Sequence, residues 1–515
     1  MPISRRSFVA GVVPWTLTAE AAFLKQQPPS LTFGPARPFN FDHLKATAKA
    51  RAGSSYKSPA RPAQDIVRTI NFDVAQKIRY RPEFALWANG PGPYPVRFFN
   101  LRETVQEPVR IHLISGDSAR PIVYDPRYFD WGNTGLDKSL PHDVGFSGFR
   151  VMNGKNVERD WLAFQGASYF RAAGGDDQYG LSARGIAVNT ATATREEFPI
   201  FTNFWIAEGA TPDAPVTIYA LLEGPSITGA YKFDVRHGKG DVMDVHAELF
   251  ARADIERLGI APLTSMFWYS ETNRNQGSDW RPEIHDSDGL CMWTGNGERI
   301  WRPLANPPGV QTNSFMDNNP KGFGLIQRDR DFENYQDDGA FYNKRPSVWV
   351  EPRGAWGEGA VQLVEINTSD EIHDNVVAYW VPKTKLAAGK SLMLDYRLYW
   401  QDPEPFLPKS VAHVVATRRG RAGIAGSQGQ PGFKFAIDFE GGALSDMQAR
   451  YDLKPVVTLS RGRVTSAYSV KVVGTRRWRA VFDAVFDGHD PANLRCVLQQ
   501  NGKPLTETWT YQVFP

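Results

Sequence analysis

The chain has 515 residues, with 59 Lys and Arg against 56 Asp and Glu, and a net charge of +3. This length predicts a large domain and a smaller second one, and the balanced charge gives no reason to expect nucleic acid or an anionic membrane as a partner. The 15 Trp, 18 Tyr and 31 Phe suit either a sugar-binding cleft or a large β core.

The N-terminus is typical of an export signal. Paired arginines stand in residues 4–9, an apolar run follows in residues 9–17, and small residues surround Glu20. Two arginines followed by Phe8 favour a twin-arginine signal, which exports folded proteins, over chance basic residues in a disordered tail. No later segment reaches the roughly 18 to 20 consecutive apolar residues of a membrane span. We expect a signal peptide at 1–21 and a mature protein in the periplasm.

Two helical segments are expected before the strands begin. Residues 41–51 form a short helical candidate. In residues 65–79 the apolar positions recur at helical spacing; they are Ile66, Ile70, Val74 and Ile78.

After these segments the apolar period changes to two. Apolar and polar residues alternate in residues 109–113, 231–235 and 394–400. Such alternation predicts half-buried strands of antiparallel sheets. Because no strand-helix-strand alternation and no repeat is seen, the sequence predicts a mostly β protein whose first domain is a large β-sandwich.

The domain boundary is expected at residues 401–408, where three prolines interrupt any strand. The five glycines of residues 418–432 predict a flexible loop, either a lid or a plain surface loop. Short strands such as 467–473 and 478–486 then suggest an immunoglobulin-like sandwich. The expected divisions are a large β-sandwich catalytic domain at 22–402, a linker with the Gly-rich loop at 403–433, and an immunoglobulin-like domain at 434–515.

The two cysteines, Cys291 and Cys496, are too few for a zinc motif or a disulfide framework. They lie on either side of the expected boundary, so we expect two separate buried thiols. No nucleophile elbow, metalloprotease helix, phosphate loop or dinucleotide motif occurs in a usable context. We expect neither a metal nor a cofactor.

Residues 268–380 mix carboxylates, arginines and aromatics without a helical period. Cleavage of a glycosidic bond needs one protonated carboxyl group and one ionised carboxylate. We select Asp286 and Asp374, because each follows a His and precedes an apolar strand that would fix its position. Acidic residues at strand ends are also common as solvated caps, so spacing alone leaves their role open. His285 and His373 are expected to orient neighbours by hydrogen bonds rather than to bind a metal.

Four stretches, residues 166–171, 179–185, 314–330 and 347–352, resemble the periplasmic glucans biosynthesis D/G family. The resemblance covers nearly all of the mature chain, and the twin-arginine leader favours the D member. It implies a galactose-mutarotase-like β-sandwich followed by an immunoglobulin-like domain. It also implies action on β-1,2-glucan, as an anomer-inverting endo-glucanase or as a transglycosylase.

The same resemblance implies residue roles. Asp374 matches the general acid and Asp286 the general base, which works through a relay of water and hydroxyl groups. Tyr342 is expected at this relay or at a sugar subsite. The loop at 420–432 would be a lid that reaches the active site of the other subunit in a homodimer.

The chemistry of such a site predicts further contacts. Enclosure and nearby Glu371 would raise the pKa of Asp374. Arg345 and Arg281 would bind sugar hydroxyls by charged hydrogen bonds, and Asp288 and His373 complete the expected substrate-binding set. Three tryptophans could either stack on sugar rings or belong to the core; they are Trp268, Trp349 and Trp380.

Two other functions stay open. One is a non-catalytic, glucan-binding scaffold that assists a membrane glucosyltransferase. The other is a mutarotase or lyase on the same sandwich, which product anomer and unsaturation would distinguish.

Overall fold

The computed structural model describes residues 30–515 except 91–92, 155–157, 208, 210, 212–213, 424–425 and 427–430. The expected signal peptide at 1–21 and part of the Gly-rich loop lie outside the described residues. Within the described ranges, no helix combines the length and the apolar character needed to cross a membrane.

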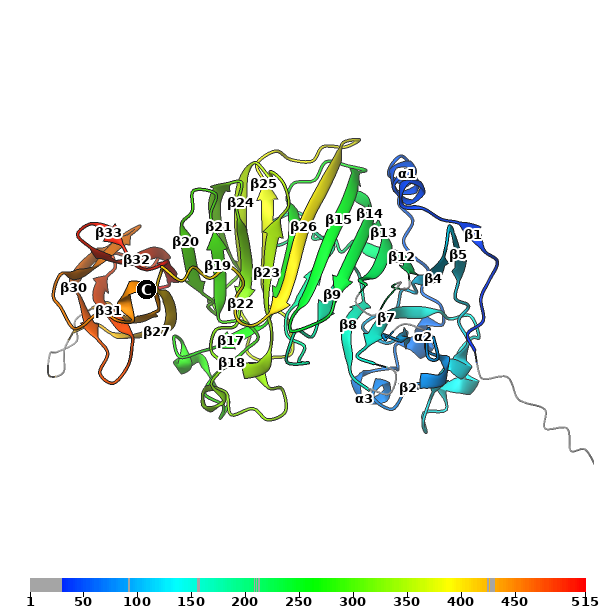
Figure 1. Cartoon of the computed structure of the whole chain (residues 1–515), viewed down its shortest axis with the longest axis horizontal. Helices are drawn as coiled ribbons and strands as arrows, with labels where there is room; N and C mark the ends of the chain where they lie inside the picture. Colours follow the sequence, from blue (N-terminus) through cyan, green and yellow to red (C-terminus); the bar gives the residue numbers. More distant parts are fainter. Residues whose placement is uncertain are drawn as a thin grey trace, which may run out of the picture.

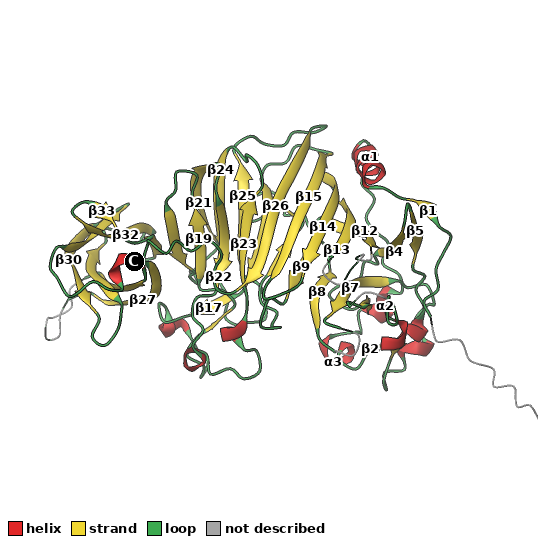
Figure 2. Cartoon of the chain, viewed as in Figure 1, coloured by secondary structure: helices red, strands yellow, loops and turns green. Residues whose placement is uncertain are grey.

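A sheet of 16 strands forms one face of the large sandwich and continues into the C-terminal domain (Figures 1 and 2). Its order is β1 (Arg37–Pro38), β5 (Ser118–Pro121), β4 (Arg110–Ser115), β12 (Ile200–Ala207), β13 (Val216–Glu223), β14 (Ile227–Arg236), β15 (Asp241–Ala251), β26 (Ser391–Gln401), β23 (Ser347–Pro352), β22 (Gly322–Ile326), β19 (Gly289–Trp293), β20 (Arg299–Pro303), β34 (Thr508–Val513), β32 (Ala492–Gln500) and β29 (Leu453–Leu459), with β33 (Lys503–Pro504) beside β32.

A second sheet of 10 strands packs against the first. Its order is β21 (Gln311–Asn318), β24 (Glu358–Glu365), β25 (Val376–Pro382), β16 (Leu258–Ser265), β10 (Ser182–Arg184), β9 (Tyr169–Ala172), β8 (Asp160–Gln165), β7 (Phe146–Met152) and β3 (Val96–Asn100), with β11 (Ile186–Val188) beside β16. Aromatic rings fill the space between the sheets: Phe164 of β8 lies 5.2 Å from Phe233 of β14, centroid to centroid.

The alternating strands are confirmed. In β14, Tyr231, Phe233 and Val235 are buried while Lys232 and Asp234 between them are half-buried. This is the pattern of a strand with one face on the core. The fold class is mostly β, with a large sandwich followed by a smaller one, as predicted. The more specific fold names of the two sandwiches stay predictions.

Short elements complete the large domain. Two pairs of strands stand apart: β17 (Phe267–Tyr269) with β18 (Ile284–His285), and β2 (Arg79–Tyr80) with β6 (Phe129–Asp130). The helices are α1 (Phe41–Ala52), α2 (Gln64–Val67) and α3 (Phe72–Ala75). Single 3₁₀ turns of the large domain lie at Pro82–Phe84, Pro126–Tyr128, Leu136–Lys138, Arg274–Gln276, Phe332–Asn334 and Tyr342–Lys344, and one in the C-terminal domain lies at Gly442–Leu444.

The helix expected at 41–51 is confirmed by α1, but the single helix expected at 65–79 is wrong. Two separate helices, α2 and α3, occupy this segment. Asn71 has an extended backbone, and its side-chain oxygen accepts a hydrogen bond from the Val74 N–H at 3.0 Å. Asparagine is a favoured N-cap, so it starts a new helix inside the periodic pattern.

The C-terminal domain packs a four-stranded sheet against β29, β32 and β34. The strand order of this sheet is β27 (His413–Arg421), β28 (Phe433–Glu440), β31 (Trp478–Val485) and β30 (Arg463–Lys471). Strand β27 lies inside residues 403–433, the segment expected to join the domains. The two cysteines are free and buried, as predicted.

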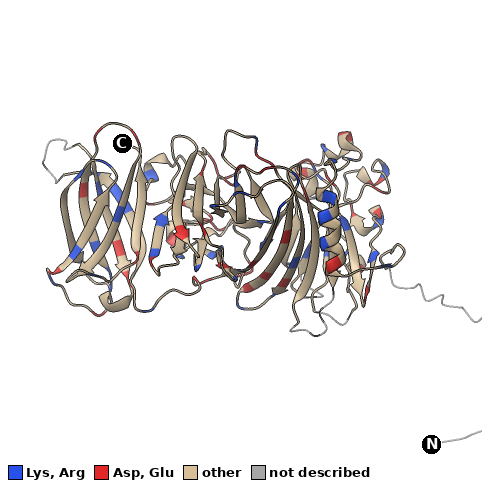
Figure 3. Cartoon of the chain, turned by 90° about the horizontal axis from the view of Figure 1, so that it is seen from above, with Lys and Arg blue, Asp and Glu red and all other residues tan. Residues whose placement is uncertain are grey.

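The joint between the domains is both hydrogen-bonded and charged. Strand β34 pairs in parallel with β20, with Trp509 opposite Trp301. Arg328 of the large domain donates to Glu507 of the C-terminal domain at 2.6 Å and to Glu404 at 2.9 Å. The Arg328 guanidinium also lies 3.7 Å from the Trp301 ring centroid. Elsewhere, charges of both signs are interspersed along the molecule (Figure 3).

Arg328→Met should destabilise the protein. The change leaves Glu507 buried without its guanidinium partner, which typically costs about 3 to 5 kcal/mol. Urea denaturation followed by tryptophan fluorescence measures the loss in the free energy of unfolding. Lys383→Met, which breaks the exposed pair with Glu358, is the control and should leave the midpoint unchanged. Equal midpoints for both variants would contradict a structural role for Arg328.

Candidate active site

Asp286 and Asp374 come from distant parts of the chain but are tied to the same backbone segment. The Asp286 N–H donates to the carbonyl of Met266 at 2.8 Å. Next to Asp374, the Asn375 side chain accepts from the Phe267 N–H at 2.8 Å and donates to the Phe267 carbonyl at 2.9 Å. Two adjacent residues, Met266 and Phe267, therefore fix the backbone beside both aspartates.

The regular sheets determine where this segment lies. Strand β16 ends at Ser265 and pairs with the start of β25, with Ser265 opposite Val376. Strand β17 then continues the chain and pairs with β18, with Phe267 opposite His285. Asp286 thus directly follows β18, and Asp374 lies two residues before β25.

Asp286 is held as an ion pair inside the protein. Its residue is 4% exposed, and its carboxylate accepts a hydrogen bond from Arg345. Burial raises the pKa of Asp286 above its ordinary value, while the Arg345 cation acts in the opposite direction. Arg345 in turn lies 4.3 Å from the ring centroid of Tyr342. The predicted neighbours Asp286, Arg345 and Tyr342 are therefore together.

Asp374 is exposed to solvent, unlike Asp286. Desolvation by the surrounding protein and the negative charge of Asp286 nevertheless raise the pKa of Asp374 to about 6. Glu371 was expected to supply this charge, but Arg281 neutralises Glu371 through bonds of 2.8 and 3.0 Å. The carboxyl that perturbs Asp374 most is the other aspartate of the pair.

Arg281 corrects a second expectation. Its guanidinium donates to Asp279, Asp337 and Glu371 through all of its nitrogens. A guanidinium has five N–H donors, and these five bonds use them all. Arg281 therefore has no donor left for a sugar hydroxyl, and its role is to hold Glu371.

Tyr342 contacts both Arg345 and Glu371, so it connects the Asp286–Arg345 pair with the Arg281–Glu371 pair. The ring is 2% exposed, and its hydroxyl donates a hydrogen bond to Glu371. Burial raises the pKa of Tyr342, and so does the hydrogen bond to Glu371. The phenol therefore stays protonated at neutral pH, and its one proton is directed at Glu371.

His285 is a buried, hydrogen-bonded residue, as predicted. Its Nδ1 contacts Gln327 at 3.1 Å and its Nε2 contacts Glu283 at 3.0 Å. Burial alone would lower the pKa of His285, but Glu283 and the charge of Asp288 outweigh it and raise the pKa to about 9. A carboxylate oxygen of Glu283, a carboxylate oxygen of Asp288 and a ring nitrogen of His285 lie within 4.8 Å of one another. The protonated His285 supplies the positive charge between the two carboxylates.

Of three further expected site residues, Asp288 and Trp349 have other roles, and His373 stays beside Asp374. The Asp288 carboxylate accepts the N–H groups of Arg328 and Asp329, so it holds the start of the loop after β22. His373 is exposed beside Asp374. Trp349 is fully buried in the core cluster shared by the two domains, which excludes it as a stacking platform for sugar.

The other two tryptophans also belong to hydrophobic clusters. Trp380 is fully buried in the main core. Trp268 is 8% exposed and packs in the same small cluster as Tyr342. Of the three tryptophans, Trp268 is the one placed close to the network.

Sequence reasoning missed Arg171 and Asn375. Arg171 is an exposed residue of β9 and lies 4.5 Å from the Tyr179 ring centroid. Its positive charge opposes the raised pKa of both Asp286 and Asp374. It is more than 100 residues away from Asp286 in the chain, so no local signal connects them. Asn375 directly follows the selected Asp374, and this position next to a candidate catalytic residue is the signal in the sequence that could have identified it.

Comparison with known proteins places the chain in a family. A family model described as "Periplasmic glucan biosynthesis protein, MdoG" matches residues 39–513. Glucans biosynthesis protein D 2 of Ralstonia nicotianae is 49% identical, over 100% of this chain and 98% of its own length. Glucans biosynthesis protein D of Xanthomonas campestris pv. campestris is 46% identical over 98% of this chain and 94% of its own length. The protein of the same name from Xylella fastidiosa is 46% identical over 95% and 92%. As its resemblance predicted, the chain belongs to the periplasmic glucan biosynthesis protein family, MdoG.

Proposed function

We propose that this protein is a periplasmic enzyme of glucan biosynthesis that acts on β-1,2-glucan with inversion of the anomer. The family description and the names of the relatives support a role in making periplasmic glucans. The observation that carries the catalytic part is the electrostatic pairing of Asp286 with Asp374, whose pKa is raised to about 6.

The two environments suit the two roles. Asp374 is exposed and has a raised pKa, so its protonated form can reach and protonate the leaving glycosidic oxygen. Asp286 is ion-paired with Arg345, which favours the carboxylate that a base requires. In inverting enzymes the two carboxyl groups stand about 6.5 to 9.5 Å apart, with the attacking group between them.

Burial of Asp286 explains why a relay is needed. A carboxylate with 4% residue exposure does not meet a sugar hydroxyl directly. The proton of the attacking group would pass to Asp286 through water or hydroxyl groups. The Tyr342 hydroxyl donates to Glu371, so it would join this relay only by turning away from Glu371. If water attacks, the product is a shorter glucan. If a sugar hydroxyl attacks, the product is a new linkage or a ring.

A homodimer in which the loop at 420–432 covers the neighbouring site is part of this proposal.

A non-catalytic scaffold that assists a membrane glucosyltransferase is the alternative. Incubation of purified protein with linear β-1,2-glucan, followed by mass analysis, separates the two functions. Shortened, elongated or cyclised chains support catalysis, whereas tight binding with unchanged chains supports the scaffold.

Asp374→Asn should lower kcat by about 10²- to 10⁴-fold while substrate binding is retained, because it removes the proton donor but keeps the side-chain shape. Reducing-end and product-size assays measure turnover, and calorimetry measures binding. Asp338→Asn changes an exposed carboxylate outside the network and is the matched control. Full activity of Asp374→Asn would refute its assignment as the acid.

The pH dependence follows from the raised pKa of Asp374. Because the acid must carry its proton, kcat/KM should fall as the pH rises above about 6.

Asp286→Asn removes a negative charge, so it should lower the pKa of Asp374 below about 6. Carboxyl NMR titration of both proteins checks this without requiring activity. An unchanged Asp374 pKa in the variant would show that the two groups do not interact.

A further inference from the structure

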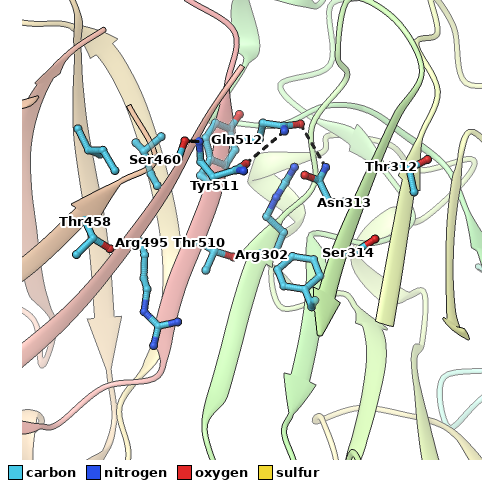
Figure 4. Close-up of a pocket in the computed structure, with 14 residues that line it drawn as sticks. Arg302, Thr312, Asn313, Ser314, Thr458, Ser460, Arg495, Thr510, Tyr511 and Gln512 are labelled. Atoms are coloured by element: carbon cyan, nitrogen blue, oxygen red, sulfur yellow. Dashed lines mark hydrogen bonds between the residues drawn. The ribbon is translucent and has the colours of Figure 1, made fainter. Parts of the chain in front are cut away.

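A groove separates the edge of the large sandwich from the C-terminal domain (Figure 4). Its volume is about 690 Å³, within the range of about 300 to 1,000 Å³ that is usual for ligand pockets. One wall is β21, the edge strand of the ten-stranded sheet, and the other is formed by β29, β32 and β34. None of the residues proposed for catalysis lines it.

The groove is lined mainly by hydroxyl and amide side chains. A row of amides joins the two walls: Asn313 Nδ2 donates to Gln512 Oε1 at 3.2 Å, and Gln512 Nε2 donates to Asn493 Oδ1 at 3.3 Å. Figure 4 shows this amide chain passing from β21 to the C-terminal domain. Within the described part of the chain, Asn313 Oδ1 and Asn493 Nδ2 have no hydrogen-bond partner. This row of three amides thus offers a hydrogen-bond acceptor at Asn313 and a donor at Asn493.

Hydroxyl groups line the wall formed by the C-terminal domain. Thr458 and Ser460 are exposed on and after β29, and Thr510 of β34 is half-buried. A hydroxyl both donates and accepts hydrogen bonds, so this wall matches a ligand that is itself rich in hydroxyl groups.

The charges of the groove are already neutralised. Arg302 donates to Glu365 at 2.8 Å, and Arg495 is paired with Glu298. The half-buried ring of Phe315 adds apolar surface. A neutral polar lining beside an aromatic ring fits an uncharged sugar better than a phosphate or a carboxylate, which would need an unpaired cation.

We infer that this groove is a second binding site for a segment of neutral glucan, separate from the catalytic pair. The inference rests on the proposed function, because it assumes that glucan is the substrate. A long chain would then bind the protein at two places, which raises its affinity without changing the chemistry at Asp286 and Asp374. The rival occupant is an extended peptide, which would add a strand to the free edge of β21.

The test uses the full-length Asp374→Asn protein, so that glucan is not consumed, and compares long linear β-1,2-glucan with a β-1,2-linked tetrasaccharide. Thr458→Trp fills the groove from an exposed strand position. Ser466→Trp, at an exposed position of β30 outside the groove, is the matched control. Thr458→Trp should weaken binding of the long glucan by about tenfold or more and leave tetrasaccharide binding unchanged.

A second measurement does not depend on a substitution. Long glucan should protect residues 311–318 and 491–512 from hydrogen–deuterium exchange, and the tetrasaccharide should not. Equal binding of long glucan by Thr458→Trp and Ser466→Trp, without this protection, would overturn the inference. Protection by an extended neutral peptide but not by long glucan would also overturn it, in favour of strand addition.

The same samples separate this inference from the proposed function. Thr458→Trp made in the otherwise native protein should turn over the tetrasaccharide at the native rate. If the native protein turns over no glucan, the proposed function fails. If the native protein does turn over glucan and Thr458→Trp leaves the binding of long glucan unchanged, only the second site fails.

Discussion

The candidate site depends on the hydrogen bonds made by two adjacent residues, Met266 and Phe267. One accepts the backbone N–H of Asp286, and the other is bonded on both sides by the Asn375 side chain. These bonds are buried, where loss of a partner leaves an unsatisfied polar group and is costly. These bonds hold the backbone beside both carboxyl groups in place, although 87 residues lie between positions 286 and 374.

A fixed relation between two carboxyl groups gives chemistry only if their environments differ. Asp286 is enclosed and has Arg345 as a bonded cation. Asp374 is open to solvent and forms no ion pair with the described residues, so the negative charge of Asp286 raises its pKa with less opposition from cations. In the proposed mechanism, the different roles of the two carboxyl groups would follow from these surroundings rather than from the residue type. The saturated guanidinium of Arg281 supports this arrangement indirectly, because it keeps Glu371 bound and Tyr342 in place.

The sequence was sufficient for features that depend on local pattern. Alternation predicted β14 and β26 and the mostly β class. The spacing of Asp286 and Asp374 left their role open, and the family resemblance assigned it. The sequence failed where tertiary contacts decide. An aromatic such as Trp349 within an apolar strand reads the same whether it faces a cleft or a core. The saturation of Arg281 requires three carboxylates from separate loops, and the influence of Arg171 comes from another strand of the sheet.

The joint between the domains connects these observations to the groove. Because β20 and β34 belong to one continuous sheet, the C-terminal domain is attached by backbone hydrogen bonds as well as by side chains. Arg328 and the buried Trp349 fill the same joint from the large domain. A wall formed by β34 is therefore fixed relative to β21, so the groove has a defined width. Trp349, which the sequence suggested for sugar binding, instead packs in this joint and contributes to the rigidity on which a second binding surface would depend.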